Sequence, residues 1–314
     1  VIIVGLFFSI IYNVLAANLR AIGDAYTPLI FLIISAVLNV VLDILCVKYM
    51  DMGVRGAAVA TVVSQAVSAV LCFGYTWKKY AFLHFNIKDF VPKKEFLKPM
   101  LEGGLSMGLM NSLVSFGTLS LQTAINTLGT NTIVAHAATR KLTNLYMLPF
   151  SVLGTTMATY SGQNYGAGRY DRIRAGLKVS LGCSYIWCVI VLIASYTVCP
   201  YLIVAITDTG ISEVIDTACL YQRFDTCFYL LVPTITILRN SLQGIGDHIT
   251  PIFSSGLELV GKVLIAMLLT PVIGYWGIIV SEPIVWAVMV IPLIVSMVKR
   301  MKRAFVNEKI RNEK

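Results

Sequence analysis

Long apolar stretches, separated by short polar segments, run through this chain from its first residue to about residue 298. A membrane-spanning helix needs about 20 consecutive, mostly apolar residues. By this criterion the sequence predicts nine spans, the first of them partial, at about residues 1–17, 28–47, 56–77, 105–128, 132–159, 179–206, 218–240, 251–271 and 277–298. A soluble protein can bury one such helix, but nine in succession predict an all-α, multi-pass membrane protein.

The composition agrees with a protein that lies in a lipid bilayer. Hydrophobic residues make up 57% of the 314 residues, charged residues make up 13%, and the mean hydropathy is +0.78. In soluble domains these classes are about half and about a quarter of the residues, so a soluble globular protein is disfavoured. The seven cysteines form no C-x-x-C pair and the three histidines lie far apart, so we expect no metal centre and no cofactor.

Lysine and arginine are distributed unequally between the two sets of loops. Nineteen of the 25 Lys and Arg residues fall in alternate loops and in the tail: Arg20, Lys78, Lys79, Lys88, Lys93, Lys94, Lys98, Arg169, Arg172, Arg174, Lys178, Arg239, Lys299, Arg300, Lys302, Arg303, Lys309, Arg311 and Lys314. The other loops carry only Lys48 and Arg55. Because Lys and Arg remain on the cytoplasmic side, we expect a cell-membrane protein with a cytoplasmic C-terminus. The net charge of +9 therefore reflects orientation, and no nucleic-acid partner is expected.

Two segments of the chain resemble each other. Residues 18–28 (NLRAIGDAYTP) and 241–251 (SLQGIGDHITP) share Leu, Ile, Gly, Asp, Thr and Pro at an offset of 223 residues. Further on, residues 53–56 (GVRG) pair with residues 274–277 (GYWG) at an offset of 221. Two matches in the same order predict a duplication. Both turn copies fall on the cytoplasmic side, so the repeats are expected to be parallel.

The repeat also predicts the organisation of a longer protein. The second half begins with the helix near Leu101, so its counterpart would begin about 120 residues before Val1, which is room for about three helices. We therefore expect an N-terminally truncated chain, unable to transport alone, from a protein with two pseudo-symmetric six-helix lobes. Its expected parts are half of the N-lobe, a basic cytoplasmic linker, the C-lobe and a basic cytoplasmic tail, at residues 1–77, 78–100, 101–298 and 299–314.

The repeated G-D-x-x-T-P segment is predicted to form a turn between two helices. Glycine supplies a backbone conformation that other residues avoid, threonine can cap the following helix, and proline suits its first turn. A gating role is the functional alternative. The residues concerned are Gly23, Asp24, Thr27 and Pro28 in the first copy, and Gly246, Asp247, Thr250 and Pro251 in the second.

Several local motifs resemble the multidrug and toxic compound extrusion (MATE) family, and its DinF-like branch in particular. They are L-R-A-x-G-D-x-x-x-P from Leu19, N-x-x-x-D from Asn39, G-V-x-G-A-A-x-A-T from Gly53, A-A-x-R at Ala137–Arg140 and G-Q-N-Y-G-A-G-R at Gly162–Arg169. The resemblance covers the chain from the fourth helix of such a transporter to its C-terminus. It implies a secondary active antiporter, not an enzyme, that exports organic, often cationic or amphipathic, compounds in exchange for H⁺ or Na⁺. The expected partners are the lipid bilayer and a small organic substrate, and the expected state is a monomer.

Asn39 and Asp43 are the leading candidates for ion coupling. They lie four residues apart in one predicted span and so share a helical face, and an ionisable residue within a span is a functional candidate by default. Their oxygens can ligate Na⁺ or hold a proton, and Thr61 in the next predicted helix could add a hydroxyl. These three residue types match the N-lobe cation site that the resemblance implies, whose fourth member would precede Val1. Alternatively, Asn39 and Asp43 only join helices by hydrogen bonds.

The second half contains further embedded charges. Glu258 and Lys262 are four residues apart, and they either pair with each other or contact the substrate. Arg140 needs a partner, for which Asp225 and Glu282 are available. We expect a broken helix directly after Glu282, because proline follows it, so that Glu282 could also line the cavity.

The second half also contains candidate aromatic contacts for a substrate, and its first predicted helix contains no carboxylate. Tyr146 and Tyr229 could receive a flat cation by cation–π contact. Another branch of the family couples ions through carboxylates on the seventh and tenth helices. Here the predicted helix at residues 104–128 contains none, and Asp225 is expected near the outer end of its helix. C-lobe coupling is therefore disfavoured.

Two other functions are weighed against transport of this kind. A flippase for a lipid-linked oligosaccharide precursor has the same superfamily fold, but it would need several cations in its cavity, and few are embedded here. A membrane-embedded enzyme would need a catalytic cluster, yet no H-E-x-x-H motif occurs. No P-loop is present either, which argues against an ATPase. The sequence specifies neither the substrate nor the choice between H⁺ and Na⁺.

Overall fold

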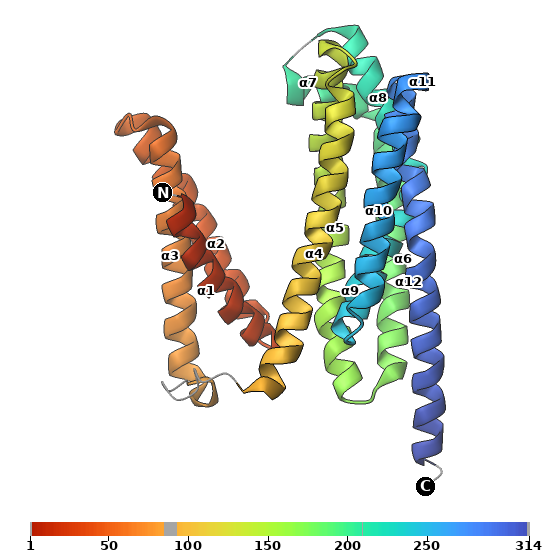
Figure 1. The fold of residues 1–314 in the computed structure, drawn as a ribbon. Coiled ribbons are helices and arrows are strands. Elements are labelled where there is room, and N and C mark those ends of the chain that lie inside the picture. Colours follow the sequence, from red (N-terminus) through yellow and green to blue (C-terminus); the bar gives the residue numbers. More distant parts are fainter. Residues whose placement is uncertain (1, 85–92, 209, 313–314) are drawn as a thin grey trace. The chain divides into compact units, whose positions relative to one another are not determined.

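All regular structure in the described part of this chain is helical. The computed structural model describes residues 2–84, 93–208 and 210–312, and no strand occurs within these ranges. The chain divides into two compact units, residues 1–93 and 94–314 (Figure 1). The predicted all-α class is confirmed. Lys88 and Lys314 of the predicted basic segments lie outside the described residues.

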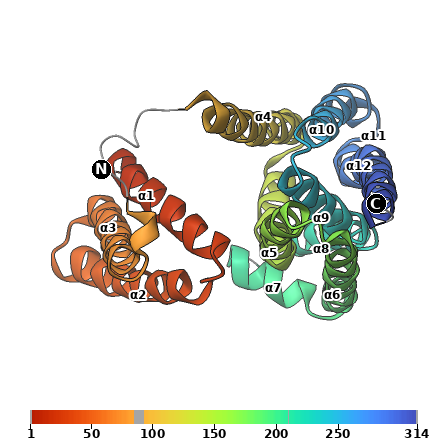
Figure 2. The same ribbon diagram turned by 90° about the horizontal axis from the view of Figure 1, so that it is seen from below.

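The first unit contains three long helices. α1 (Ile2–Ala21) and α2 (Tyr26–Asp43) both pack against α3 (Gly53–Lys79), which a short 3₁₀ turn at Ala81–Leu83 follows (Figure 2). Small side chains on α3 allow helix backbones to approach closely. The buried face of α3 includes Gly56, Ala60, Ser64, Ser68 and Ala69.

α2 changes its helical geometry at the residue that matters most for the ion-coupling hypothesis. After Asp43 the chain continues as a π-helix, Ile44–Tyr49, and the Ile44 N–H bonds to the carbonyls of both Val40 and Val41. π-helical turns are rare and frequently occur at functional positions. The local geometry therefore singles out the same carboxylate that the sequence pattern selects.

The second unit contains nine helices within its described residues. They are α4 (Lys94–Ile125), α5 (Thr130–Gly166), α6 (Tyr170–Thr197), α7 (Cys199–Thr207), α8 (Ser212–Thr226), α9 (Leu231–Gly244), α10 (Ile249–Leu268), α11 (Thr270–Ile273) and α12 (Tyr275–Asn312). α5 packs against α6, α7, α8 and α9, while α10 packs against both α4 and α12 (Figures 1 and 2). Leu142, Tyr146 and Phe150 of α5 belong to the main apolar core. α5 and α10 thus make most of the contacts between helices in this unit.

Glycines allow α5 and α9 to lie close together. A Cβ at Gly154 would lie 2.9 Å from Thr236 Cγ2, and a Cβ at Gly162 would lie 3.0 Å from the Gly244 carbonyl oxygen. A Cβ at Gly244 would overlap the carbonyl oxygen of Ala158. Small residues at regular spacing are typical of membrane helices that pack through their backbones.

The described helices differ in how closely they match the predicted spans. Six of them are long and apolar enough to cross a membrane: α1, α2 with its π-helix, α3, α6, α10 and α12. The spans predicted at residues 105–128 and 132–159 fall on α4 and α5, which are long but are not among these six. Polar side chains in such helices are tolerated where the helix packs against other helices rather than against lipid.

Two predicted spans are interrupted. The helix predicted at residues 179–206 begins earlier and ends at Thr197, and α7 starts anew with Pro200 in its first turn. The span predicted at residues 218–240 is divided between α8 and α9 by a turn at residues 227–230, and Pro233 lies in the first turn of α9. Proline lacks the N–H that an uninterrupted helix requires. Each break is accordingly followed by a helix with proline in its first turn, Pro200 in α7 and Pro233 in α9.

One predicted break is absent. α12 runs without interruption from Tyr275 to Asn312 and contains Pro283 and Pro292 within it. The prediction of a broken helix after Glu282 is therefore wrong. Proline is tolerated inside membrane helices when the surrounding structure compensates for the missing hydrogen bond.

Both copies of the repeated turn have the same backbone geometry. Gly23 and Gly246 have φ angles of +93° and +82°. The N–H of the next residue donates to a carbonyl five residues earlier, at 2.9 Å for Asp24 and 2.8 Å for Asp247. This is a Schellman ending, in which glycine adopts the left-handed conformation. The predicted need for glycine in the turn is confirmed.

The helix after each turn is capped by aspartate rather than by threonine. Asp24 Oδ1 accepts a hydrogen bond from the Thr27 N–H at 3.1 Å, and Asp247 Oδ1 accepts one from the Thr250 N–H at 3.2 Å. Each threonine lies inside its helix and donates its own hydroxyl to the same carboxylate. The prediction that threonine caps these helices is wrong, because the aspartate three residues earlier already accepts the free amide.

Candidate functional site

Lys262 is the centre of a buried ion network in the second unit. Its Nζ lies 3.0 Å from Glu258 Oε1, one turn earlier on α10, and 3.3 Å from Glu282 Oε1 on α12. The pair at spacing four forms as the sequence predicts. Gly117 of α4 leaves room for the lysine stem, since a Cβ there would lie 3.1 Å from Lys262 Cδ.

Two arginines extend the network to neighbouring helices. Arg140 Nη1 of α5 lies 3.4 Å from Glu282 Oε1, and Arg239 Nη2 of α9 lies 3.5 Å from Glu258 Oε2. The four helices α5, α9, α10 and α12 thus supply three cations and two carboxylates. Burial of an unpaired charge costs several kcal/mol, and here each cation has a carboxylate within ion-pair distance.

Arg239 lies inside a helix and not in a cytoplasmic loop. The sequence pattern assigns it to a cytoplasmic loop, but it lies inside α9, its side chain is buried, and it pairs with Glu258. An arginine near the end of an apolar segment looks the same in sequence whether it points into a loop or towards a buried carboxylate. Only the packing of α9 against α10 distinguishes the two cases.

Asp225 lies buried beside this network. It is the penultimate residue of α8, directly before the break in the span, and it is 1% exposed. Neither carboxylate oxygen accepts a hydrogen bond of ordinary geometry among the described residues, although the Tyr229 hydroxyl lies close enough to act on the carboxylate. Arg140 and Glu282 lie within electrostatic range of it. The sequence predicts only that Asp225 lies near the outer end of a span. It does not show the break after α8, and so it does not show that Asp225 is buried there.

A polar aromatic group adjoins the network. His136, one turn before Arg140 on α5, has Nδ1 3.2 Å from the Tyr275 hydroxyl. Its ring also meets the ring of the buried Tyr221 edge-on, with centroids 5.5 Å apart. The sequence pattern does not select these residues, since an isolated histidine and two tyrosines form no motif. The available signal is spacing: His136 lies four residues before Arg140, and Tyr221 lies four residues before Asp225.

Tyr146 and Tyr229 are buried in the apolar core. The Tyr229 hydroxyl lies within hydrogen-bonding distance of Gln222 Nε2, at 3.3 Å, and of Thr143 Oγ1, at 3.5 Å. The backbone carbonyl of Tyr146 accepts a hydrogen bond from the Trp187 indole N–H at 3.0 Å. Their proposed contact with a substrate stays a prediction, which would require the surrounding side chains to move.

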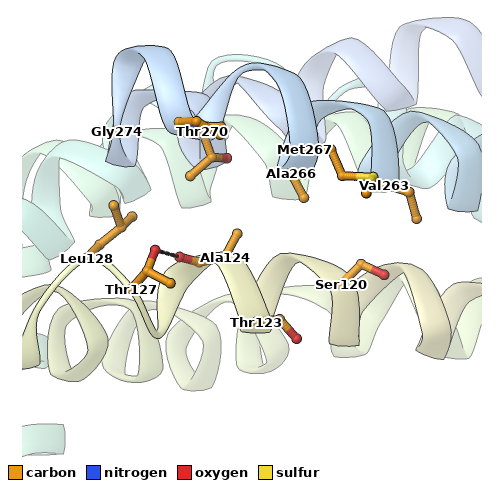
Figure 3. A pocket seen from close by; sticks show the side chains of 11 residues that line it. Ser120, Thr123, Ala124, Thr127, Leu128, Val263, Ala266, Met267, Thr270 and Gly274 are labelled. Atoms are coloured by element: carbon orange, nitrogen blue, oxygen red, sulfur yellow. Dashed lines mark hydrogen bonds between the residues drawn. The ribbon is translucent and has the colours of Figure 1, made fainter.

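A groove of about 700 Å³ lies between α4 and the α10–α11 segment (Figure 3). Ser120 and Thr123 line it from α4, Thr127 lines it from the turn after α4, and Val263 and Met267 line it from α10. Its walls are largely apolar, with a few hydroxyl groups on one side. A mostly apolar concave surface with a few polar groups is typical of a site for a small organic molecule.

In the first unit, Asn39 and Asp43 lie on α2 and Thr61 lies on α3. Asn39 Nδ2 and Asp43 Oδ1 are both buried and have no hydrogen-bond partner among the described residues. Thr61 is exposed and donates its hydroxyl to the Ala57 carbonyl at 2.9 Å. The described contacts therefore do not join Thr61 to the other two residues, and the joint cation site stays a prediction.

The turn before α2 is anchored by two tyrosine hydroxyls and a lysine that lie at or just after the end of α3. Asp24 Oδ2 accepts hydrogen bonds from the Tyr75 and Tyr80 hydroxyls at 3.1 and 2.9 Å. Lys79 Nζ lies 3.9 Å from the same oxygen. The carboxylate thus ties the turn before α2 to the end of α3.

The turn before α10 is anchored in the same way. Asp247 Oδ2 accepts hydrogen bonds from Ser296 Oγ at 2.8 Å and from Arg300 Nε at 2.9 Å, both on α12. These positions are related to Tyr75 and Lys79 by the same offset of 221 residues (296 − 75 and 300 − 79). The duplication therefore includes the anchor as well as the turn.

Both anchoring aspartates are ionised at neutral pH. Burial by itself raises the pKa of Asp24, but hydrogen bonds from Thr27 and the two tyrosine hydroxyls outweigh it and lower the pKa to about 2. Burial likewise opposes ionisation of Asp247, while the hydrogen bonds from Thr250 and Ser296 and the charge of Arg300 lower its pKa. These carboxylates suit a fixed anchor better than a proton carrier. No group of three or more His, Cys, Asp or Glu side chains in the described ranges could hold a metal ion.

Comparison with known proteins gives consistent matches. The MatE family pattern matches residues 107–268. The probable multidrug resistance protein YpnP of Bacillus subtilis is 31% identical over 54% of this chain and 38% of its own length. The multidrug export protein MepA of Staphylococcus aureus is 26% identical over 83% of this chain and 55% of its own length. The chain thus spans between about two fifths and just over half of the length of the curated relatives it matches.

Solved structures agree on the fold. A MATE protein crystallised in a bent conformation superposes with a TM-score of 0.86 at 20% identity, over 96% of this chain and 68% of its own. A MOP superfamily transporter from Pyrococcus furiosus superposes with a TM-score of 0.87 at 22% identity, over the same shares. The predicted MATE-type fold is confirmed.

Proposed function

We propose, from the premise that this chain belongs to the MatE family, that it serves in a secondary active antiporter of the cell membrane. The transporter exports organic, often cationic or amphipathic, compounds in exchange for H⁺ or Na⁺, and it acts as a monomer. Two observations support the substrate class: the relatives are named for multidrug resistance and multidrug export, and the second unit contains a largely apolar groove. The six long apolar helices support the location in a bilayer.

The observation that carries ion coupling is the contrast between paired and unpaired carboxylates. Glu258 and Glu282 each lie in ion pairs, whereas Asp43 Oδ1 is buried without a donor among the described residues. A buried acceptor without a partner costs about 1–3 kcal/mol. Binding of H⁺ or Na⁺ would supply the missing partner, so the cost is recovered when the ion is present.

In the proposed cycle Asp43 takes up the ion from the outer side and releases it to the cytoplasm. If the ion is Na⁺, the carboxylate supplies the charge and Asn39 and Thr61 supply neutral oxygens, which are the ligands that hard cations prefer. Ion binding alters the packing around α2 and lowers the affinity for substrate. Such coupling is reciprocal, so substrate must weaken ion binding by the same factor.

Asp225 is a second candidate for the coupling carboxylate, and a specific observation favours it. Both of its oxygens are buried without a hydrogen bond of ordinary geometry among the described residues, and it lies at a break in a membrane-embedded segment. Interrupted helices are typical of ion and substrate sites in transporters. A change in its charge would act directly on Arg140 and Glu282.

The flippase alternative receives less support. A flippase would need cations that are free to bind a pyrophosphate head group, since each phosphate contact requires a donor. Arg140, Arg239 and Lys262 each lie within ion-pair distance of a carboxylate. These three embedded cations are therefore committed to internal partners.

The test uses the full-length gene product in membrane vesicles, with dye efflux driven by an imposed H⁺ or Na⁺ gradient. Asp43→Asn is expected to keep expression and substrate binding but to abolish gradient-driven efflux. Asp51→Asn, in the loop between α2 and α3, is the matched control and should behave like the parent. If Asp43→Asn pumps normally and Asp225→Asn does not, coupling belongs to the second unit. If both variants pump like the parent, coupling by these carboxylates is refuted.

A further inference from the structure

A second pocket of the second unit lies where the apolar part of α12 gives way to its cationic end. It has a volume of about 720 Å³, and its walls come from the junction of α5 and α6, the start of α10 and the end of α12. We name it the α12 pocket, and its chemistry is set by Tyr165, Phe253, Val295, Lys299, Arg300 and Arg303. It is separate from the buried ion network and from the groove between α4 and α10.

The α12 pocket is positively charged. Its lining includes three cations and one carboxylate, Asp247, which gives a net charge of +2. Asp247 is already enclosed by four donors, one of which is Arg300 Nε at 2.9 Å. Lys299 and Arg303 are exposed, and neither forms an ion pair within the described ranges. Two cations are therefore free to bind an anion.

One wall of the same pocket is apolar and uncovered. Ile249 is 81% exposed and Phe253 is 58% exposed, and Val295 of α12 is also exposed. Exposed large apolar side chains beside an apolar span are favourable only against lipid. The pocket thus joins a cationic floor to a surface suited to hydrocarbon, and this combination disfavours a cationic substrate as the occupant.

Two tyrosines complete the rim of the pocket. Tyr165 at the end of α5 and Tyr170 at the start of α6 pack edge to face, with ring centroids 5.7 Å apart. Tyrosine is enriched at the level of lipid headgroups, where its ring is apolar and its hydroxyl can donate. Their place beside Lys299 and Arg303 marks this end of the unit as a membrane–water boundary.

We propose that the α12 pocket binds an anionic phospholipid. The phosphodiester lies against Lys299 and Arg303, a tyrosine hydroxyl donates to the headgroup, and an acyl chain lies along Ile249, Phe253 and Val295. Basic pockets between membrane helices are suited to anionic headgroups. The lipid would rest on α12 next to Arg300 and so stabilise the anchor that holds the turn before α10. This site needs only a bilayer location and does not depend on which ion is transported.

The test compares lipids on the delipidated full-length protein in non-ionic detergent. Native mass spectrometry measures retention of phosphatidylglycerol against phosphatidylcholine, and thermal unfolding measures stabilisation by each lipid and by inorganic phosphate. Phosphatidylglycerol is expected to be retained preferentially and to raise the unfolding temperature. The double variant Lys299→Gln/Arg303→Gln should bind it at least about tenfold more weakly, because two surface cations are removed.

A matched control lies on the same helix. Lys302→Gln removes one charge in the same layer but outside the pocket, and it should change affinity less than twofold. Phe253→Asn tests the apolar wall and should weaken binding of phosphatidylglycerol. Equal loss in Lys302→Gln and the double variant, or equal retention of both lipids, would overturn the proposal. Displacement of phosphatidylglycerol by millimolar inorganic phosphate would identify a free-phosphate site and would also overturn it.

Discussion

Arg300 Nε donates to Asp247 Oδ2 at 2.9 Å and thereby fixes α12 to the turn that precedes α10. Lys79 occupies the equivalent position in the first unit, where its Nζ lies 3.9 Å from Asp24 Oδ2. The two copies use different cations on the same carboxylate. The bond of Arg300 is the more direct one, because a guanidinium presents fixed donors while an ammonium acts as a point charge.

Replacement of Asp247 tests the strength of the anchor. Asp247→Asn removes the charge that holds Arg300 and weakens four hydrogen bonds, so it should lower the free energy of unfolding by about 1–3 kcal/mol. Thermal unfolding of the purified full-length protein measures the change. Asp171→Asn is the control, since its ion pair with Arg169 is about half exposed and should contribute at most about 1 kcal/mol. An equal effect of both variants would show that the Asp247 anchor has no special role.

The anchor in the first unit should depend on pH only in strong acid. The pKa of Asp24 is lowered to about 2, below its unfolded value of about 3.9. The stability it contributes is therefore fully present above pH 4 and is lost as the pH falls towards 2. The difference in unfolding temperature between the parent and Asp24→Asn should be constant from pH 5 to 8 and should shrink between pH 4 and 3. A difference that changes between pH 5 and 8 would contradict the low pKa.

Removal of the shared cation should strongly destabilise the second unit. Lys262→Met leaves Glu258 and Glu282 buried with weaker compensation, and loss of one partner of a buried ion pair typically costs about 3–5 kcal/mol. The exposed neighbour of Arg140 provides the control, as Lys141→Met should change stability little. The double variant Lys262→Met/Glu282→Gln should recover part of the loss, because one unpaired carboxylate is then neutral. Additive losses in the double variant would disprove direct coupling of the two residues.

Gly244 offers a test of helix packing. In Gly244→Ala the new Cβ would overlap the Ala158 carbonyl oxygen, so α9 must move away from α5. Overpacking of this kind costs about 1–3 kcal/mol. Gly256→Ala on α10 meets nothing within 4 Å and should be neutral or slightly stabilising, since alanine favours the helix. Unfolding temperatures of the two variants in detergent decide the point.

The expected orientation can be measured by cysteine labelling from outside the cell, with the natural cysteines replaced. Single cysteines at Asp51 and Glu213 should be labelled by a membrane-impermeant reagent, and those at Lys78 and Arg172 should not. The physical reason is that Lys and Arg are retained in the cytoplasm. The reverse pattern would contradict the cytoplasmic C-terminus.

Much of the architecture follows from the chain itself. Apolar runs of membrane-spanning length predict an all-α membrane protein, and the G-D-x-x-T-P repeat locates the two turns in which Gly23 and Gly246 adopt positive φ. Spacing of four residues likewise predicts the pair of Glu258 and Lys262. Each of these features depends on nearby positions in sequence, where helical geometry fixes which side chains meet.

The tertiary structure decides everything that joins distant helices. It brings Glu282 to Lys262 and Arg140, buries Arg239 that the charge pattern assigns to a loop, and places Asp225 beside a break in its span. It also runs α12 straight through a proline where the sequence predicts a break. A buried charge or a proline is tolerated only if a neighbouring helix compensates for it. That compensation depends on packing between segments far apart in the chain, so local sequence does not reveal it.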